Sequence, residues 1–291
     1  MEPLPLRTRR LYATIFFVLF IIILPIVGLY ASGYRLSGLS LIPTGGIHLS
    51  APVSGLAVSI NGEEVERSSL FSRSFFFDNL SPGSYVVSTA SDEFYPWSKN
   101  VTVESRVVTD LAALAVRQPL LVRELVVATS SVAVSLDSAT STVRRVTQDE
   151  LTTLVSIFAA TTTASTSPSS DPGALPILAE SGGVQLLIVN GDLLVRWERS
   201  SLPPSSFCLK PSSCVTVFAL ERGDETVLDA RFFGGGVVYN TRESGIYFSD
   251  VDVRSPRFTI PVFTAPRATF EVVNNTLYVE SDESYFEVSG F

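Results

Sequence analysis

The chain has 291 residues and a formal net charge of −8. Beyond residue 45 it carries 17 basic and 28 acidic residues, so this part has a net charge of −11. A surface of this charge repels phosphate backbones and anionic lipid, which excludes nucleic acid as an expected partner.

A twenty-residue run, Leu11–Tyr30, contains no formally charged residue, and Arg7, Arg9 and Arg10 stand directly before it. As a helix it is about 30 Å long, which matches the hydrocarbon core of a bilayer. We therefore expect residues 11–31 to span a membrane, with the lipid bilayer as the partner of Leu11–Tyr30. Because basic residues remain in the cytoplasm, we expect a cytoplasmic tail at residues 1–10 and extracytoplasmic domains after the span, as in a single-pass cell-membrane protein.

The alternative to an anchor is a cleaved signal peptide, since the small residues Ala31, Ser32 and Gly33 follow the apolar run. The apolar part of a signal peptide is shorter, about 7–15 residues. Tyrosines at both ends of the run are also typical of the interface belt of a membrane-spanning helix. The anchor is the favoured interpretation.

Short apolar runs broken by Gly, Pro, Asn and Ser begin at residue 45 and predict β-structure. Turn signals occur at Asn61-Gly62 and at Ser81-Pro82-Gly83. Five strands are expected, at Ile47–Leu49, Ala57–Ile60, Phe75–Phe77, Tyr85–Thr89 and Val101–Val103. Short strands at this spacing predict a small β-sandwich over residues 45–115.

Three sequence elements in this region resemble a known family. The segments are Pro52–Gly62 (PVSGLAVSING), Leu80–Tyr85 (LSPGSY) and Glu93–Trp97 (EFYPW). They resemble the PEGA domain, an extracytoplasmic β-sandwich of bacterial and archaeal surface proteins. The first element departs from the family pattern, because it has one extra residue and Leu56 stands where alanine is usual. The residues that carry the resemblance are Pro52, Gly55, Asn61, Gly62, Leu80, Pro82, Gly83, Tyr85, Tyr95 and Trp97.

The resemblance implies a fold rather than a site, because the family's motif residues lie in turns and in the core. Gly62 and Gly83 are expected to adopt backbone angles that a side chain disfavours. Tyr85, Tyr95 and Trp97 are expected to fill the core. The alternative for the aromatic residues is an exposed platform at residues 94–97 that stacks on a sugar ring.

A second β-rich region is expected at residues 120–291. Four segments each pair two apolar-rich strands about a polar turn: Val132–Val146, Val184–Glu198, Gly236–Val253 and Thr276–Val288. Their turns recur at roughly 40–55 residues, near the repeat of propeller blades. The predicted fold class is therefore mainly β, with an N-terminal transmembrane helix, a small PEGA-like β-sandwich and a propeller-like domain. An open stack or a second sandwich remains an alternative for the last part.

One helix interrupts this region. Thr147 and Glu150 form the pattern of a capping box, and apolar residues follow at helical spacing, which predicts a helix at about residues 148–160. The next residues, Thr161–Gly173, are rich in Ser, Thr and Pro and predict a long exposed loop, so that helix and loop together occupy about 147–173.

The two cysteines, Cys208 and Cys214, lie close together around Pro211. No histidine is near and zinc takes four ligands, so a disulfide that pins a hairpin is the favoured interpretation in an extracytoplasmic compartment. A redox-active pair and two free thiols are the alternatives.

No catalytic constellation is evident in the sequence. The single histidine, His48, is expected to be a partly exposed structural residue of a strand, and any hydrolytic triad depends on it. The glycines at 234–236 lack the lysine of a phosphate-binding loop and predict a turn. Carboxylates gather at Asp224-Glu225, at Asp250 with Asp252 and at Asp282-Glu283. They are expected to lie in solvated turns and strand ends.

These observations predict a membrane-anchored extracytoplasmic protein that is not an enzyme and that binds or scaffolds at the cell envelope without a cofactor or metal. Its expected partner is an envelope protein or a glycan. The alternative is an extracytoplasmic enzyme that acts on glycans through acidic residues such as Asp250 or Asp282.

Overall fold

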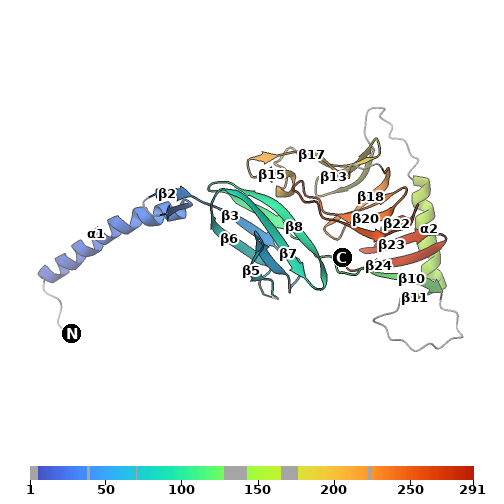
Figure 1. Ribbon diagram of the computed structural model, residues 1–291, viewed down its shortest axis with the longest axis horizontal. Coiled ribbons are helices and arrows are strands. Elements are labelled where there is room, and N and C mark those ends of the chain that lie inside the picture. Colours follow the sequence, from blue (N-terminus) through green and yellow to red (C-terminus); the bar gives the residue numbers. More distant parts are fainter. Residues whose placement is uncertain (1–5, 38–39, 70, 128–142, 165–175, 222–224) are drawn as a thin grey trace.

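The computed structural model describes residues 6–37, 40–69, 71–127, 143–164, 176–221 and 225–291. Within these residues the protein is mainly β-structure, with two α-helices. Figure 1 shows helix α1 at one end of the long axis, a first group of strands next to it, and a second group with helix α2 at the far end.

Helix α1 (Leu6–Ala31) is the one described helix that is long and apolar enough to cross a membrane. The mean hydropathy of its most apolar stretch is 2.7, and no part of that stretch is buried by the rest of the protein. The helix begins at Leu6 rather than at Leu11 as predicted, so the three arginines lie in its first turns. It ends at the predicted position.

An antiparallel hairpin follows α1 directly. It consists of β1 (Tyr34–Ser37) and β2 (Ser40–Pro43), in a segment for which the sequence predicts no element. Each strand has only four residues, too few to display a clear alternation.

Seven strands in two sheets form the unit next to α1, called here the proximal unit (residues 45–112). One sheet has the order β6–β3–β9 and the other has the order β5–β4–β7–β8. Their bounds are β3 (Gly45–Ser50), β4 (Ala57–Ile60), β5 (Glu63–Arg67), β6 (Ser74–Leu80), β7 (Gly83–Ser91), β8 (Phe94–Val103) and β9 (Val108–Ala112). Strands β3 and β9 are parallel, and the other neighbours are antiparallel.

The five predicted strands of this region lie within β3, β4, β6, β7 and β8. Strands β5 and β9 are additional. Strand β5 has the sequence EEVER and is exposed along its whole length, so it carries no apolar alternation. Strand β9 alternates exposed and buried residues, but a threonine, Thr109, takes one of its two buried positions and Val108 is exposed, which weakens the apolar alternation.

Three sheets form the distal unit (residues 121–289). The orders are β12–β13–β14–β17, β18–β19–β20–β21 and β11–β10–β24–β23–β22. The bounds in the first sheet are β12 (Ile177–Ser181), β13 (Val184–Val189), β14 (Asp192–Trp197) and β17 (Val217–Glu221). Those in the second are β18 (Val227–Phe233), β19 (Gly236–Thr241), β20 (Gly245–Ser249) and β21 (Thr259–Phe263). Those in the third are β10 (Leu121–Val127), β11 (Val143–Val146), β22 (Thr269–Val273), β23 (Thr276–Ser281) and β24 (Ser284–Ser289).

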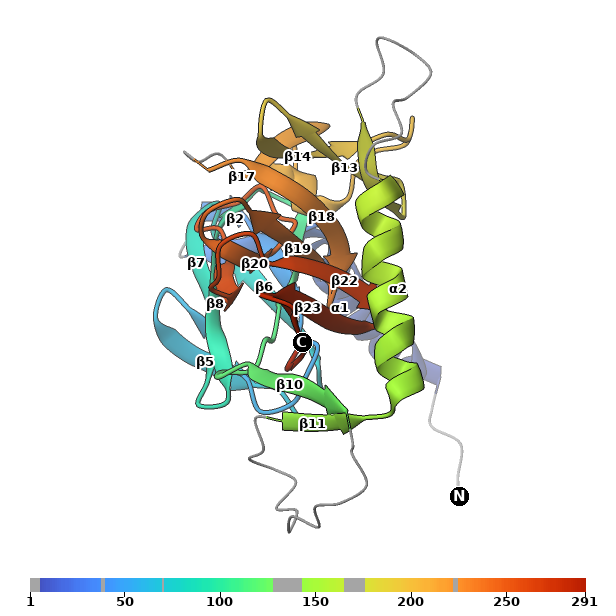
Figure 2. The same cartoon turned by 90° about the vertical axis from the view of Figure 1, so that its right-hand side faces the viewer.

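Two smaller features complete the distal unit. A 3-10 helix, η1 (Ser205–Phe207), leads into the short hairpin of β15 (Cys208–Lys210) and β16 (Ser213–Cys214). Helix α2 (Gln148–Ala164) covers the third sheet, where Leu154 and Phe158 are buried together with Tyr278 of β23. Figure 2 shows α2 running across the ends of strands of the distal unit.

Three of the four predicted hairpins are confirmed, as β13–β14, β19–β20 and β23–β24. The first predicted hairpin is described only in its last strand, β11, which pairs in parallel with β10. Its other half and its turn lie outside the described residues. Helix α2 begins as predicted but continues to Ala164, so Thr161–Ala164 are helical and not part of a loop. The rest of the predicted loop lies outside the described residues.

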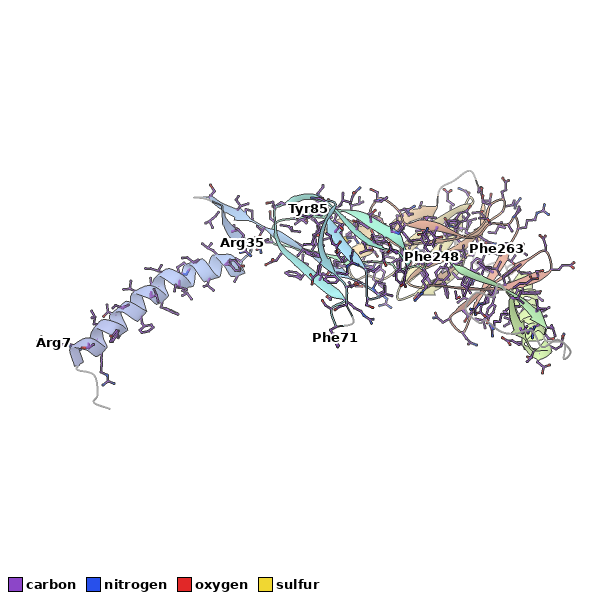
Figure 3. The ribbon with its side chains drawn as sticks, turned by 60° about the horizontal axis from the view of Figure 1, so that its bottom comes forward. Arg7, Arg35, Phe71, Tyr85, Phe248 and Phe263 are labelled. Carbon is purple, nitrogen blue, oxygen red and sulfur yellow. A yellow bond between two sulfur atoms is a disulfide. The ribbon has the colours of Figure 1, made fainter. Side chains whose placement is uncertain are left out.

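One buried apolar cluster runs through both units. It contains Ile47, Val58 and Trp97 of the proximal unit together with Phe248 and Val279 of the distal unit. Phe248 lies where the two units meet (Figure 3). The proximal unit is therefore packed against the distal unit through a shared core rather than tethered to it.

Candidate functional site

A cavity of about 570 Å³ lies where the proximal and distal units meet. Its wall is formed by the residues after β9, the β12–β13 turn, helix η1, the β18–β19 turn and the segment after β20. Six polar side chains line it: Ser181, Ser205, Ser206, Asp250, Asp252 and Arg254. Ligand sites in proteins are concave, mostly apolar and carry a few polar groups, so this inter-unit cleft is the candidate binding site.

A buried ion pair lies in the wall of the cleft. Lys99 of β8 is 0% exposed, and its Nζ lies 2.6 Å from Oδ2 of Asp250, whose side chain is 6% exposed. The same ammonium donates to the carbonyl oxygens of Arg254 at 3.0 Å and Pro256 at 2.9 Å. All three oxygens come from the segment between β20 and β21. The charge of Lys99 is thus satisfied entirely by the distal unit.

Burial and the neighbouring lysine shift the pKa of the Asp250 carboxyl group in opposite directions. Burial raises the pKa of Asp250, because the charged form loses its hydration. The attraction to Lys99 opposes that rise. A hydrogen bond from the Phe258 amide to Asp250 Oδ1 at 3.3 Å also opposes it, and burial remains the larger effect, so the pKa of Asp250 stays above its ordinary value.

Asp252 and Arg254 form a second ion pair beside the first. The guanidinium Nε lies 2.8 Å from Asp252 Oδ1, and Nη2 lies 2.6 Å from Oδ2. Arg254 Nη1 also donates to the backbone oxygen of Asp110 in β9, at 3.2 Å. This two-pronged geometry fixes both side chains and adds a further link between the units.

The carboxylates of the cleft are bound to cations of the protein, which makes them poor metal ligands. Among the described residues, no group of three or more His, Cys, Asp or Glu side chains is placed to hold a metal ion. The expectation that Asp250 and Asp252 are solvated is wrong, because both are buried between the units. Asp282 and Glu283 do lie in an exposed turn, and Asp282 lines a different cavity from Asp250. Asp224 is outside the described residues.

The three glycines of the β18–β19 turn shape the cleft. Gly234 and Gly235 have φ values of +54° and +80°, which side chains rarely adopt. A Cβ on Gly236 would lie 2.5 Å from the carbonyl oxygen of Ser249. The predicted turn is confirmed, and the glycines permit a close approach of two strands at the cavity wall.

A second group of polar side chains lies on the outer face of sheet β6–β3–β9. His48 Nδ1 is 3.0 Å from Asp110 Oδ1, and His48 Nε2 is 2.6 Å from Ser74 Oγ. The three residues come from three neighbouring strands, with His48 on the central one. Their order is that of a Ser-His-Asp triad. The sequence gives no sign of this, because Ser74 and Asp110 are 26 and 62 residues from His48.

Solvation distinguishes this group from a working triad. In serine hydrolases the aspartate is buried, which strengthens its hold on the imidazolium. Here the Asp110 side chain is 64% exposed and that of His48 is 38% exposed. The arrangement is a cross-strand hydrogen-bond chain on an open surface, and His48 is partly exposed as predicted.

The residues that carry the resemblance to the PEGA domain occupy turns and core positions of the proximal unit. Asn61 and Gly62 form the β4–β5 turn, with φ values of +52° and +84°. Gly55 has a φ of +87° in the loop that follows Pro52. The expectation for Gly83 is wrong, because its φ is not in the left-handed region. Asn79 adopts that conformation instead, with a φ of +65°.

The aromatic motif residues differ in burial. Trp97 is fully buried in the core, whereas Tyr85 and Tyr95 are half-buried and pack against it. Tyr85 also donates its hydroxyl to the backbone oxygen of Ser81 at 2.9 Å and so fixes the turn that contains Pro82, while Leu80 packs on the core. A sugar-stacking platform at residues 94–97 would have to do without the Trp97 ring.

A disulfide joins Cys208 to Cys214 across the β15–β16 hairpin. This hairpin contacts the proximal unit, because the Ser212 amide donates to Glu104 Oε2 at 2.9 Å. Lys210 Nζ lies 3.9 Å from the same carboxylate. The disulfide therefore closes a hairpin, as predicted, and the hairpin forms part of the boundary between the units.

Comparison of the chain with known proteins finds no matching family model, no similar curated protein and no similar solved structure. A function for this protein is therefore inferred from its own residues and geometry.

Proposed function

We propose that the protein is a membrane-anchored extracytoplasmic scaffold without catalytic activity. Helix α1 anchors it, with its N-terminus in the cytoplasm. The proximal unit serves as a PEGA-like spacer, and the distal unit presents a binding surface, which includes the inter-unit cleft, to an envelope protein or a glycan.

The observation that carries this proposal is the buried contact between the two units. A flexible tether between units exposes its linker and leaves the facing surfaces polar. Here the Lys99–Asp250 pair is buried, and the apolar core continues across the boundary. Buried charges that are paired and hydrogen-bonded fix one relative placement, since any other placement leaves a charge unpaired. The proximal and distal units, fixed to each other in this way, form one rigid body, called here the arm. The arm holds a binding surface at a set distance from the membrane.

The arrangement of the distal sheets supports a propeller-like character for this unit. Apart from β10 and β11, the strands of the three sheets follow one another along the chain, and neighbouring strands are antiparallel except for the parallel pair β10–β11. Strand β10, at the start of the unit, completes the last sheet by pairing with β24 at its end. Pairing of the first strand with the last is how a circular array of sheets closes. For the proximal unit, seven strands in two sheets support a PEGA-like sandwich.

The test is a distance measurement between the units in the full chain, embedded in phosphatidylcholine nanodiscs. Spin labels are placed on Val65→Cys of β5 and Leu202→Cys of the distal unit, both of which are exposed. Since Cys208 and Cys214 are paired, the labels have no competing thiol. We expect one narrow distance distribution, as narrow as that of the within-unit control pair Val65→Cys and Val108→Cys. A broad distribution for the inter-unit pair alone contradicts the proposal.

A second candidate function is ester or amide hydrolysis at Ser74, favoured by its contact with His48. In such a reaction Ser74 Oγ attacks an acyl carbon while its proton passes to His48 Nε2. The leaving group then takes up that proton, and water releases the acyl group by the same route in reverse. Hydrolysis is the second candidate because the Asp110 side chain is exposed to solvent, whereas the aspartate of a serine hydrolase is buried.

A fluorophosphonate probe separates the two candidates. A hydrolase reacts at Ser74, and the reaction is lost in Ser74→Ala and His48→Gln. The scaffold proposal predicts that the wild-type protein is labelled no faster than Ser74→Ala. Another exposed serine near the start of β7, Ser84, provides the matched control as Ser84→Ala.

A further inference from the structure

The junction between α1 and the proximal unit is a defined structure. Helix α1 ends at Ala31, and Gly33 turns the chain with a φ of +78°. The backbone oxygen of Gly33 then accepts hydrogen bonds from the amide and the hydroxyl of Thr44, at 2.8 and 3.2 Å. Thr44 in turn accepts from the amide of Arg106 at 2.7 Å. The base of the β1–β2 hairpin is thus fixed between the end of α1 and the β8–β9 loop.

The hairpin extends from this base toward the side from which α1 arrives. In Figures 1 and 3, which share the horizontal long axis, the hairpin lies beside the last turns of α1 and not beside the proximal unit. Its β2 strand exposes Leu41 and Ile42, which are 48% and 37% exposed. In a bilayer spanned by α1, strand β2, which carries these side chains, lies beside the end of the span.

Arginines and aromatic rings surround the same junction. The Arg35 guanidinium lies 3.8 Å from the centroid of the Tyr30 ring, and that of Arg106 lies 5.8 Å from the Tyr34 ring. A cavity of about 430 Å³ opens here, and its lining includes Tyr30, Arg35, Arg106 and Asp78. Arg35 Nη2 lies 3.4 Å from Oδ2 of Asp78, so in the free protein this guanidinium is paired with a half-exposed carboxylate that a lipid phosphate would replace. Tyrosine is enriched at the membrane interface, and arginine donates to phosphate in a two-pronged geometry.

We propose that this junction is a second membrane contact, in which the β1–β2 hairpin lies in the headgroup region of the outer leaflet. Leu41 and Ile42 enter the boundary with the acyl chains, and Arg35 and Arg106 bind phospholipid phosphates. This inference rests on the proposed anchoring by α1. The occupant is the bilayer, because the hairpin that carries these exposed apolar residues follows the apolar helix α1 directly in the chain and contacts it through β1.

Two considerations determine how deep the β1–β2 hairpin lies in the bilayer and which lipid it contacts. A two-stranded hairpin has unpaired backbone groups along both edges, which keeps it out of the hydrocarbon and in the headgroup region. The net charge of the chain beyond residue 45 is −11, so the whole exterior is not drawn to anionic lipid. A hairpin in the headgroup region whose arginines contact the phosphates of zwitterionic lipid agrees with this depth and with this net charge. Such a contact would set the tilt of the arm relative to the membrane.

The test is depth-dependent quenching in bilayers. The full chain is reconstituted into phosphatidylcholine vesicles that contain brominated acyl chains, with a bimane label on one introduced cysteine. Leu41→Cys reports on the hairpin. Val18→Cys, in the middle of α1, reports on anchoring, and Val65→Cys of β5, which is 52% exposed, is the matched control for an exposed strand residue.

We expect the Leu41 label to be quenched several-fold more than the Val65 label, and most strongly by bromines near the headgroups. Quenching at Val18 without quenching at Leu41 overturns this inference and leaves the anchor intact. Absence of quenching at Val18 shows instead that the anchoring itself fails.

The arginines are tested in the same vesicles. Arg35→Gln/Arg106→Gln is expected to reduce the quenching of the Leu41 label, whereas Arg67→Gln, an exposed arginine of β5, leaves it unchanged. Unchanged quenching in the double variant overturns the phosphate contact. Quenching at Val18 serves again as the check that the variant is inserted.

Discussion

At the scale of single residues, the contact between Lys99 and Asp250 has the largest expected effect on stability. The two residues are 151 positions apart, and each is surrounded by protein. Removing one partner of a buried pair leaves the other charge unpaired, which costs more than the pair itself contributes.

Lys99→Met is therefore expected to lower the free energy of unfolding by about 3–5 kcal/mol. The matched control is Lys210→Met, because Lys210 is partly exposed and lies 3.9 Å from Glu104. That change is expected to cost at most about 1 kcal/mol. Urea unfolding of the full chain in detergent measures both, and equal effects of the two variants contradict the assignment of a buried charge pair.

The effect of Lys99→Met is also expected to depend on pH. Burial raises the pKa of Asp250, so the folded state binds this proton more tightly than the unfolded chain does. The contribution of this group to the free energy of unfolding is fully present below the ordinary carboxyl pKa of about 3.9. It is lost as the pH rises through the raised pKa of the folded state. Without Lys99 the rise is larger, because the opposing attraction is gone.

The loss of stability caused by Lys99→Met is therefore expected to be greater at pH 7 than at pH 5. The double variant Lys99→Met/Asp250→Asn removes the titrating group and is expected to lose this difference. Urea unfolding at the two pH values, each compared with the wild type, measures it. A loss of the same size at both values shows that Asp250 is not the group responsible.

At the scale of elements, helix α2 tests how far a local signal determines the structure. Thr147 Oγ1 accepts a hydrogen bond from the Glu150 amide at 3.2 Å, as the capping box predicts. The other half of the box differs, because the Glu150 carboxylate accepts from Arg144 Nη2 at 2.8 Å. Leu154 and Phe158 then pack the helix on the third sheet.

Thr147→Ala is expected to lower the stability of the distal unit by about 1 kcal/mol, because an amide of the first turn loses its acceptor. Thr152→Ala is the control. Thr152 is exposed within the helix and donates to the Gln148 carbonyl, and alanine is the better helix former there. Far-UV circular dichroism during urea unfolding reports both variants. A loss in Thr152→Ala as large as that in Thr147→Ala contradicts the role of the cap.

The elements that could be predicted from the sequence are those with local signals. Helix α1 follows from its apolar length, the start of α2 from its cap, and β13–β14 from a turn at Asn190-Gly191 between apolar runs. The pairing of β11 with β10 could not be predicted, because the two strands are parallel and a long connection separates them. The β1–β2 hairpin has strands too short for a pattern to show.

At the scale of the whole molecule, the sequence predicts the parts better than their contacts. The order of anchor, proximal strands and distal strands is evident from composition and spacing. The cleft is not, because its wall combines residues after β9, in η1 and after β20, which lie far apart in the chain. The same holds for His48 with Ser74 and Asp110, which only the strand order brings together.

The contacts between units give the molecule its expected mechanical character. The shared apolar core, the Lys99–Asp250 pair, the hydrogen bond from Arg254 to Asp110 and the contact of Ser212 with Glu104 all join the proximal to the distal unit. In the proposed function this makes the exterior a single arm, and α1 determines which side of the membrane the arm occupies. The orientation of α1 is therefore the central claim.

The most direct test of that claim is cysteine labelling in intact cells. Phe71→Cys lies in the loop before β6 and is fully exposed, and Thr8→Cys lies in the first turns of α1. We expect a membrane-impermeant maleimide to label Phe71→Cys in intact cells and Thr8→Cys only after permeabilisation, with the N-terminal segment retained in the intact mass. The reverse labelling pattern, or a mass that corresponds to a chain beginning near Tyr34, would contradict the anchored extracytoplasmic arm.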